Sequence, residues 1–221
     1  REGWYVLDED RKYPSVTTLL KTIDKSGPLM RWAARGAVEA LMENPALSVE
    51  QAIGAAFQRR DAAADLGKTV HSFIEALKAG ADIDPTALPE ALRGYGQAFV
   101  SWMVAYEPKI LHRELTVYSD THQYAGSTDM IVQLRDSRVV IVDAKTGKGL
   151  YPEFGVQMAA YRVAANEMIE TGKLLCPTVE GEFLLHLKPD GNFEFRETHE
   201  PVEILFHAKV IWFWLQSQGG L

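Results

Sequence analysis

The hydrophobic periodicity of the chain changes at Pro108, and this change limits the possible folds more than any other feature of the sequence. Before Pro108, apolar residues recur at three- and four-residue spacing, as they do on one face of an amphipathic helix. The segments with this spacing are 27–44, 48–80 and 88–108, and we expect the second to break into two helices near Gly67. A short hairpin is expected over 3–16, with the acidic "DED" at its turn.

Beyond Pro108 the pattern predicts a β-sheet. Segments 110–119, 124–136 and 137–147 alternate or run apolar between polar turns, which indicates three consecutive strands. A helix is expected over 152–172, then a hairpin around "KPDGN" at 188–192, followed by an apolar helix that closes the chain. This order predicts an α/β fold with a central mixed sheet flanked by helices.

Length and composition favour one ordinary globular domain. The 221 residues suffice for one substantial core, and 47% hydrophobic with 24% charged residues is typical of globular proteins. We expect a single domain over 1–221. Its parts would be a helical region over about 15–107, a sheet-containing core over about 108–200 and a final helix over about 201–218.

Charge, cysteine content and hydropathy exclude several classes of protein. The net charge of -7 argues against coating nucleic acid by bulk electrostatics, but not against gathering carboxylates around metal ions. Cys176 is the only cysteine, which excludes an internal disulfide framework and an all-cysteine iron–sulfur cluster. No apolar run approaches the roughly 20 residues that span a bilayer. We therefore expect a cytoplasmic protein without membrane association, encoded by a cell or by a phage acting in its host.

The strand "VVIVDAKTGK" at 139–148 ends in an acid and a base on one face, since side chains two apart on a strand share a face. Asp129, inside "AGSTDMIV", lies where an apolar run has begun and is costly to bury without a partner. If the two strands pair as a hairpin, Asp129 and Asp143 approach each other. Two close carboxylates repel, and a divalent cation such as Mg²⁺ or Mn²⁺ stabilises such a pair.

Lys145 would then orient or deprotonate an attacking water, or neutralise charge on a phosphate. Carboxylates, a cation and a positioned water are the parts that metal-assisted phosphodiester hydrolysis requires. The alternative is a solvated turn, because many surface hairpins contain the same spacing. Likewise His71 on its helix could be a core histidine, and Gln157 with Tyr161, four apart on one helical face, could be a packed pair.

Five short motifs taken together resemble a known family. "GKTVH", "RELTVY", "GSTD", "IVDAKTG" and "QMAAY" are similar, in order and spacing, to the RecB/Cas4-like exonuclease branch of the PD-(D/E)XK nuclease superfamily. "YPSVTTLL" and "LMRWAARGA" also resemble the amino-terminal segment of phage and bacterial exonucleases in that branch, so the resemblance covers roughly 13–165. It implies a restriction-endonuclease-like core and a metal-dependent DNA exonuclease that leaves 5′-phosphates, in recombination, repair or replication.

The resemblance also implies a role for each matching residue. Asp129 and Asp143 would bind one or two Mg²⁺ or Mn²⁺ ions, with the carbonyl of Ala144 and with His71 as further ligands. Lys145 would be the catalytic lysine. Gln157 and Tyr161 would contact DNA and support the site, while Glu114 would bind or tune a second metal ion.

Two departures from the family limit what is carried over. Ala144 stands where a bulkier residue is frequent, but only its carbonyl is needed. Relatives with an iron–sulfur cluster carry four cysteines, so this chain would be a cluster-free member. Any ATP-driven unwinding would have to come from a helicase or recombination partner, and the oligomeric state is open.

Parts of the sequence also resemble motifs of other protein classes. "LGKTVH" ends like a phosphate-binding loop, but Ala62 replaces the required first glycine and no strand precedes it, so an NTPase is excluded. His112 and His122 match no zinc pattern and are expected at the surface. A structure-specific endonuclease and a non-catalytic, nuclease-like DNA-binding module stay as alternatives.

Overall fold

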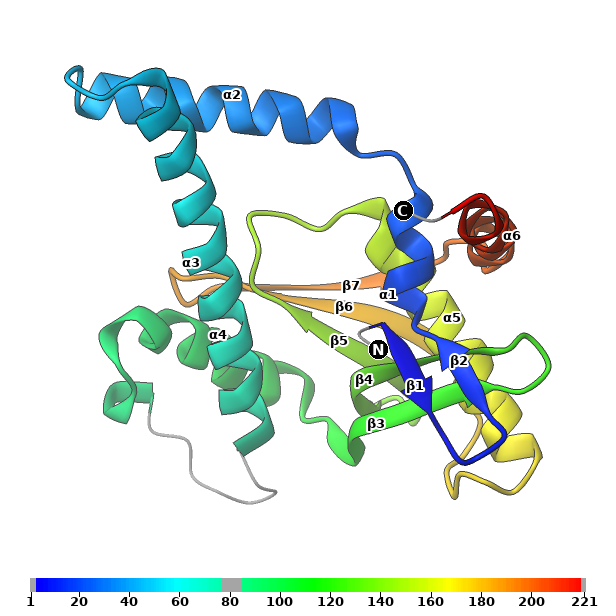
Figure 1. Cartoon of the computed structure of the whole chain (residues 1–221). Helices are drawn as coiled ribbons and strands as arrows, with labels where there is room; N and C mark the ends of the chain where they lie inside the picture. Colours follow the sequence, from blue (N-terminus) through cyan, green and yellow to red (C-terminus); the bar gives the residue numbers. More distant parts are fainter. Residues whose placement is uncertain (1–2, 77–84, 220–221) are drawn as a thin grey trace. The chain divides into compact units, whose positions relative to one another are not determined.

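The chain, seen here as a computed structural model, is described for residues 3–76 and 85–219; the side chains of 63, 64, 66, 68, 71–76 and 87 lie outside the description (Figure 1). It forms two compact units. One comprises Arg1–Thr22 with Val70–Leu221 and contains the sheet; the other is Ile23–Thr69. The expectation of a single nuclease domain stays a prediction.

The second unit is built by α2 (Ser26–Glu43) and the first part of α3 (Val49–Ala76). Trp32 of α2 meets Phe57 of α3 edge-on, with ring centroids 5.9 Å apart. The predicted break near Gly67 is wrong, because α3 is continuous through it. One interior glycine costs only about 1 kcal/mol relative to alanine, and the surrounding "DAAADL" consists largely of strong helix formers.

The predicted sheet is confirmed. Among the described residues its strands are β3 (Lys109–Ser119), β4 (Tyr124–Gln133), β5 (Val139–Lys145), β6 (Gly181–Leu187) and β7 (Phe193–Thr198), in that spatial order. Neighbouring strands are antiparallel except β5 and β6, which are parallel and joined through α5 (Pro152–Glu170). The sheet is therefore mixed, as expected.

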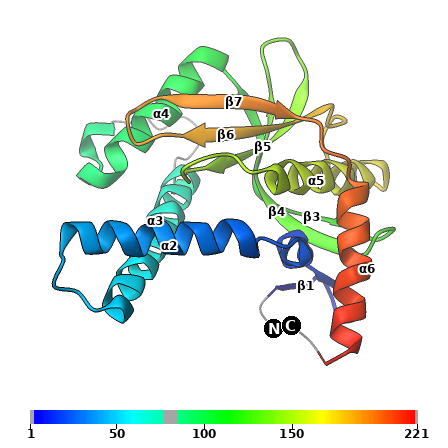
Figure 2. The same cartoon turned by 90° about the horizontal axis from the view of Figure 1, so that it is seen from above.

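Helices cover both faces of this sheet (Figure 2). Trp102 of α4 (Glu90–Tyr106) contacts Phe195, which stacks on Phe183 at 4.5 Å. Glu182, the neighbour of Phe183 on β6, is paired instead with Arg162 of α5. Because successive side chains of a strand point to opposite faces, α4 and α5 cover opposite sides.

The amino-terminal hairpin of β1 (Trp4–Val6) and β2 (Lys12–Pro14) also forms as predicted. Ser15 caps the short α1 (Val16–Leu19) and bridges to Ala125 of β4. Short 3₁₀ turns cover Leu20–Thr22 and Pro85–Ala87. The last helix, α6 (Glu203–Ser217), places Trp212 edge-on against Trp4, with centroids 5.5 Å apart.

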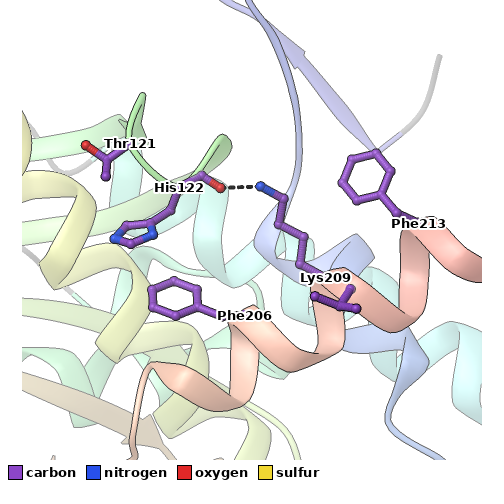
Figure 3. Close-up of a pocket in the computed structure, with 6 residues that line it drawn as sticks. Thr121, His122, Phe206, Lys209 and Phe213 are labelled. Atoms are coloured by element: carbon purple, nitrogen blue, oxygen red, sulfur yellow. Dashed lines mark hydrogen bonds between the residues drawn. The ribbon is translucent and has the colours of Figure 1, made fainter.

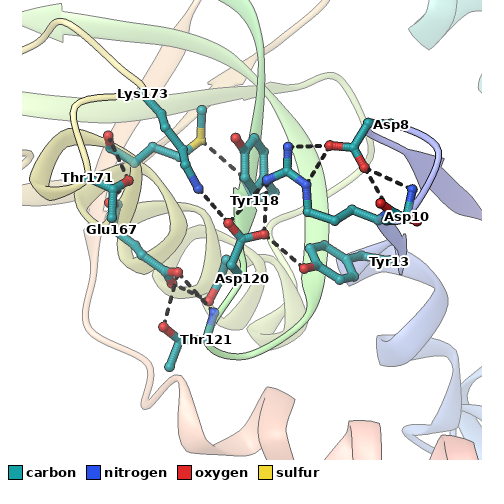
Figure 4. Close-up of polar contacts among 12 residues, drawn as sticks. Asp8, Asp10, Tyr13, Tyr118, Asp120, Thr121, Glu167, Thr171 and Lys173 are labelled. Carbon is teal, nitrogen blue, oxygen red and sulfur yellow. Dashed lines mark hydrogen bonds and ion pairs between the residues drawn. The ribbon is translucent and has the colours of Figure 1, made fainter.

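Asp120, in the turn between β3 and β4, joins three distant segments (Figure 4). Its carboxylate accepts hydrogen bonds from Lys173 at 2.5 Å, Tyr13 at 2.8 Å and Arg11 at 3.2 Å. The Lys173 bond, followed by those from Tyr13 and Arg11, lowers the pKa of Asp120 from its ordinary value. The hairpin, the β3–β4 turn and the segment after α5 are thereby fixed to one another.

Candidate active site

The site lies where the β4–β5 ladder ends. The last registered pair is Met130 with Val142, and the next residues on the two strands are Asp129 and Asp143. Here the Ala144 N–H donates to Asp129 Oδ2 at 2.6 Å. A side-chain carboxylate has thus replaced the backbone acceptor of a regular ladder, which brings Asp129 onto the backbone of β5 beside Asp143.

Lys145 balances the charge of Asp143. The Asp143 side chain is buried, and Lys145 Nζ lies 2.5 Å from its Oδ2. The same amine lies over the Phe154 ring, 4.6 Å from its centroid. A buried carboxylate is stable only when paired and hydrogen-bonded. The acid and the base at the end of this strand are therefore a close ion pair on the face covered by α5, and not a solvated turn.

Gln157 and Tyr161 of α5 form a buried pair next to these groups. Gln157 Nε2 donates to the Tyr161 hydroxyl at 2.8 Å. The ring occupies the space above Gly126, where a Cβ would come within 2.2 Å of Tyr161 Cε1. Burial, and then the charge of Asp143, raise the pKa of Tyr161 far above its ordinary value. The hydroxyl therefore stays protonated and lies close enough to Asp143 to sense its charge.

Glu114 lies beside the carboxylates along the next strand. The pairs Arg113–Met130 and Leu115–Thr128 flank it, so the register places Glu114 opposite Asp129. Its φ of 45° lies in the left-handed region, which residues other than glycine adopt rarely, and such strained residues cluster at active sites. Its role as a second acid stays a prediction.

Two predicted ligands are only partly tested by this geometry. His71 belongs to α3, but its side chain is outside the described part of the chain. Ala144 is fully buried, and its N–H donates the hydrogen bond that Asp129 accepts. Metal binding by its carbonyl remains an expectation from the resemblance.

The donors present fit a hard divalent cation. Asp129 and Asp143 supply carboxylate oxygens, the ligand type that Mg²⁺ and Mn²⁺ prefer. Among the residues with described side chains, no three His, Cys, Asp or Glu side chains form a group that could hold a metal ion. Mg²⁺ keeps several water ligands and is commonly bound through only one or two carboxylates, so these two acids suffice as its protein side-chain ligands.

His186, which none of the sequence motifs singled out, lies on β6 in parallel register with Lys145. Its ring is almost fully buried, and Nε2 lies 2.7 Å from the Gly147 carbonyl. Because a carbonyl only accepts, Nε2 carries the hydrogen. His186 therefore fixes the loop that follows Lys145. A polar residue inside the apolar run "FLLHL" was the available signal.

Tyr5 of β1 also reaches the strand that carries Asp129. Its hydroxyl is 3.0 Å from Ser127 Oγ, two residues before that acid. The amino-terminal hairpin therefore forms part of the surroundings of the site, although its own sequence resembles an ordinary surface hairpin.

Comparison with known proteins found no matching protein-family model and no matching curated protein. Several solved structures are similar to this chain. An alkaline exonuclease from Laribacter hongkongensis, LHK-Exo, is 9% identical with a TM-score of 0.43, over 94% of this chain and 93% of that one. SSO0001 is 16% identical with a TM-score of 0.37, over 93% of this chain and 76% of its own.

A structure of LHK-Exo in complex with dAMP is 13% identical, with a TM-score of 0.36, over 85% of this chain and 91% of that one. The similarity to these structures thus extends over most of the chain. Among the described residues, no helix is both long and apolar enough to cross a membrane.

Proposed function

We propose that this protein is a Mg²⁺- or Mn²⁺-dependent DNA exonuclease that hydrolyses phosphodiester bonds and leaves 5′-phosphates. The observation that carries the proposal is the convergence of Asp129, Asp143 and Lys145 at the end of the β4–β5 ladder. Two carboxylates and an amine at one splayed strand end are more than a hairpin needs for its stability. They match what phosphodiester hydrolysis requires.

In this proposal Asp129 and Asp143 hold the metal ion, which when bound would stabilise negative charge on the scissile phosphate. Lys145 acts on the reacting groups: its ammonium, paired with Asp143, orients the attacking water and offsets charge on the phosphate. The ion pair with Asp143 and the Phe154 ring keep this amine in place. Gln157 and Tyr161, bonded to each other, fix α5 against the strands. Contact of this pair with DNA is what the family resemblance implies.

The reaction forms one bond and breaks one. Water oxygen attacks phosphorus while the bond from phosphorus to the 3′ oxygen breaks. The water proton leaves to solvent, and the 3′ oxygen takes up a proton from solvent. The products are a 3′-hydroxyl and a 5′-phosphate.

The test is digestion of end-labelled linear DNA, single- and double-stranded, beside a closed circle. Each substrate is incubated with Mg²⁺, Mn²⁺ or EDTA, and Asp143→Ala serves as the control for contaminating nucleases. We expect metal-dependent loss of linear DNA only, and none with the variant. The position of the label then reports the polarity of digestion.

Cutting of the closed circle would instead identify an endonuclease. Absence of cleavage under every condition, with DNA binding retained, would favour the non-catalytic DNA-binding module. If addition of a helicase or recombination protein restored cleavage, the exonuclease assignment would stand. The protein that restored it would show which class of partner the enzyme requires.

Metal binding is measurable without activity. Because a ligand that binds only the folded state at about 100 times its Kd adds about 2.7 kcal/mol of stability, saturating Mn²⁺ should raise the melting temperature of the wild type. Asp129→Asn keeps an oxygen for the Ala144 N–H but loses the charge, so its melting temperature should respond less. Equal increases in melting temperature in both proteins would show that Asp129 is not a metal ligand.

A further inference from the structure

A hollow of about 460 Å³ lies outside the candidate active site, between the β3–β4 turn and α6 (Figure 3). It is lined by Thr121, His122, Phe206, Lys209, Val210 and Phe213. The His122 ring stacks on Phe206 with centroids 4.3 Å apart, so His122 is not simply a solvated surface residue. Aromatic faces and one amine thus converge on a space that the proposed reaction does not use.

Lys209 is the unusual member of this group. Its amine donates to the His122 carbonyl and lies 5.8 Å from the Phe213 ring centroid. Partial burial lowers its pKa, and no carboxylate of the described part of the chain forms an ion pair with it. An ammonium has three N–H donors, and the carbonyl uses one. A partly desolvated cation that has spare donors and forms no ion pair with a described residue is suited to an anion.

The surroundings of this cation are apolar and open. Phe213 is 45% exposed and Val210 is 70% exposed, although both are large hydrophobic residues. An anion that also carries a flat apolar ring would cover these side chains and pair with Lys209. A nucleotide has both parts, since every base has a face that stacks on aromatic side chains.

We propose that this hollow binds one nucleotide of the DNA strand at a distance from the scissile bond, with its phosphate on Lys209 and its base against the phenylalanine rings. The choice of DNA rests on the proposed function. The hollow is near the start of β4, where Tyr124 lies 6.5 Å from Phe206. Asp129 is five residues further along the strand, or about 17 Å at ~3.3 Å per residue.

This separation predicts a length dependence. At the ~3.4 Å rise of one strand of B-DNA, the path from Asp129 to the hollow spans on the order of five nucleotides. Cleavage of a dinucleotide should therefore not depend on Lys209 or Phe213. Binding of a strand of about a dozen nucleotides should depend on both, because such a strand spans the distance with room at each end.

The experiment measures fluorescence anisotropy of a labelled oligothymidylate of about a dozen nucleotides in EDTA, so that nothing is cut. Lys209→Gln and Phe213→Ala should each weaken binding roughly fivefold or more. Lys209→Gln should also reduce the slope of log K against log salt by about 1. Ile211→Ala is the matched control, since Ile211 is 47% exposed on the same helix but does not line the hollow.

The outcomes separate this proposal from the proposed function. If the wild type cuts DNA while both hollow variants bind and cut long strands normally, the hollow proposal is overturned. If the variants bind weakly while the wild type cuts nothing in Mg²⁺ or Mn²⁺, the catalytic proposal fails and the hollow stands. Melting curves show whether each variant is folded. If Phe213→Ala does not fold, the binding measurement with Lys209→Gln tests the proposal by itself.

Two further arms identify the occupant. Free dTMP that competes with the strand, and loses this ability in Lys209→Gln, would support a nucleotide site that also accepts free nucleotides. Size-exclusion chromatography tests self-association. If Phe213→Ala converts an oligomer into a smaller species without affecting DNA binding, the face is a contact between copies and the proposal is wrong.

Discussion

At the scale of single residues, the candidate site depends on how a buried carboxylate is kept charged. Asp143 is 4% exposed, and the desolvation of a carboxylate is costly unless a cation or hydrogen bonds compensate it. Lys145 supplies the cation at 2.5 Å. The same proximity places the amine next to any phosphate that approaches the two acids, so one contact serves both stability and the proposed chemistry.

Replacement of Lys145 by Ala should abolish most cleavage, because the amine contacts the reacting groups in the proposed reaction. The rate of label release should fall roughly 100-fold or more. Lys148→Ala is the control, since Lys148 is an exposed lysine three residues further along the chain. If Lys145→Ala retained most of its activity while remaining folded, the role of this lysine would have to be abandoned.

His186 offers a test of the loop after Lys145. His186→Leu removes the donor to the Gly147 carbonyl, whereas His186→Gln can place an N–H at a similar position. We expect faster trypsin cleavage after Lys148 in the leucine variant than in the wild type, and near-normal cleavage in the glutamine variant. Identical digestion of all three proteins would contradict the assigned contact.

At the scale of elements, close approach of backbones decides how the sheet meets its helices. Gly94 and Gly96 lie inside α4, where they weaken the helix-forming pattern. A Cβ at Gly94 would lie 1.8 Å from the Pro189 carbonyl oxygen in the β6–β7 turn. Gly94 lowers the stability of the helix itself, but its missing side chain lets α4 pack directly against that turn, and this contact offsets the loss.

Two alanine substitutions in helices should consequently have opposite effects on stability. Gly94→Ala forces the β6–β7 turn away and should lower the free energy of unfolding by about 1–3 kcal/mol. Gly54→Ala in α3 meets no atom within 4 Å and should raise it by about 0.5–1 kcal/mol. Denaturant unfolding followed by circular dichroism measures both changes. Stabilisation by Gly94→Ala would show that α4 and the turn are not in this close contact.

At the scale of the whole molecule, Asp120 ties together segments far apart in the sequence, from Arg11 to Lys173. Its depressed pKa means that the folded state favours the carboxylate more than the unfolded chain does. This contribution to stability is fully present above the ordinary aspartate pKa of 3.8 and is lost as the pH falls through the lower folded value.

Asp120→Asn should therefore be less stable than the wild type at neutral pH, and the difference should shrink as the pH falls below about 4. Melting temperatures of both proteins across that range measure the difference. A constant difference from pH 7 to pH 2 would show that the charge of Asp120 contributes nothing. Asp136→Asn is a control, because Asp136 also has a lowered pKa but its ion partner, Arg138, lies only two residues away.

The types and order of most elements could be predicted from the sequence, because hydrophobic periodicity is a local property of the chain. The strands around Asp129 and Asp143, and α5 with Gln157 and Tyr161, lie where the pattern placed them. The shared face of Asp143 and Lys145 also followed from strand alternation. The continuity of α3 through Gly67 was not predicted from the sequence, because the small free-energy cost of one glycine is spread over a long helix.

Contacts between distant residues were decided only by the tertiary structure. Three such contacts depend on strand register or helix docking. They are the hydrogen bond from the Ala144 N–H to Asp129, the bond by which His186 holds the loop after Lys145, and the hollow beside Lys209. Register and docking are set by the packing of the whole core, which no short segment encodes. The sequence therefore determined which residues can do the proposed chemistry, and the tertiary structure determined which of them meet.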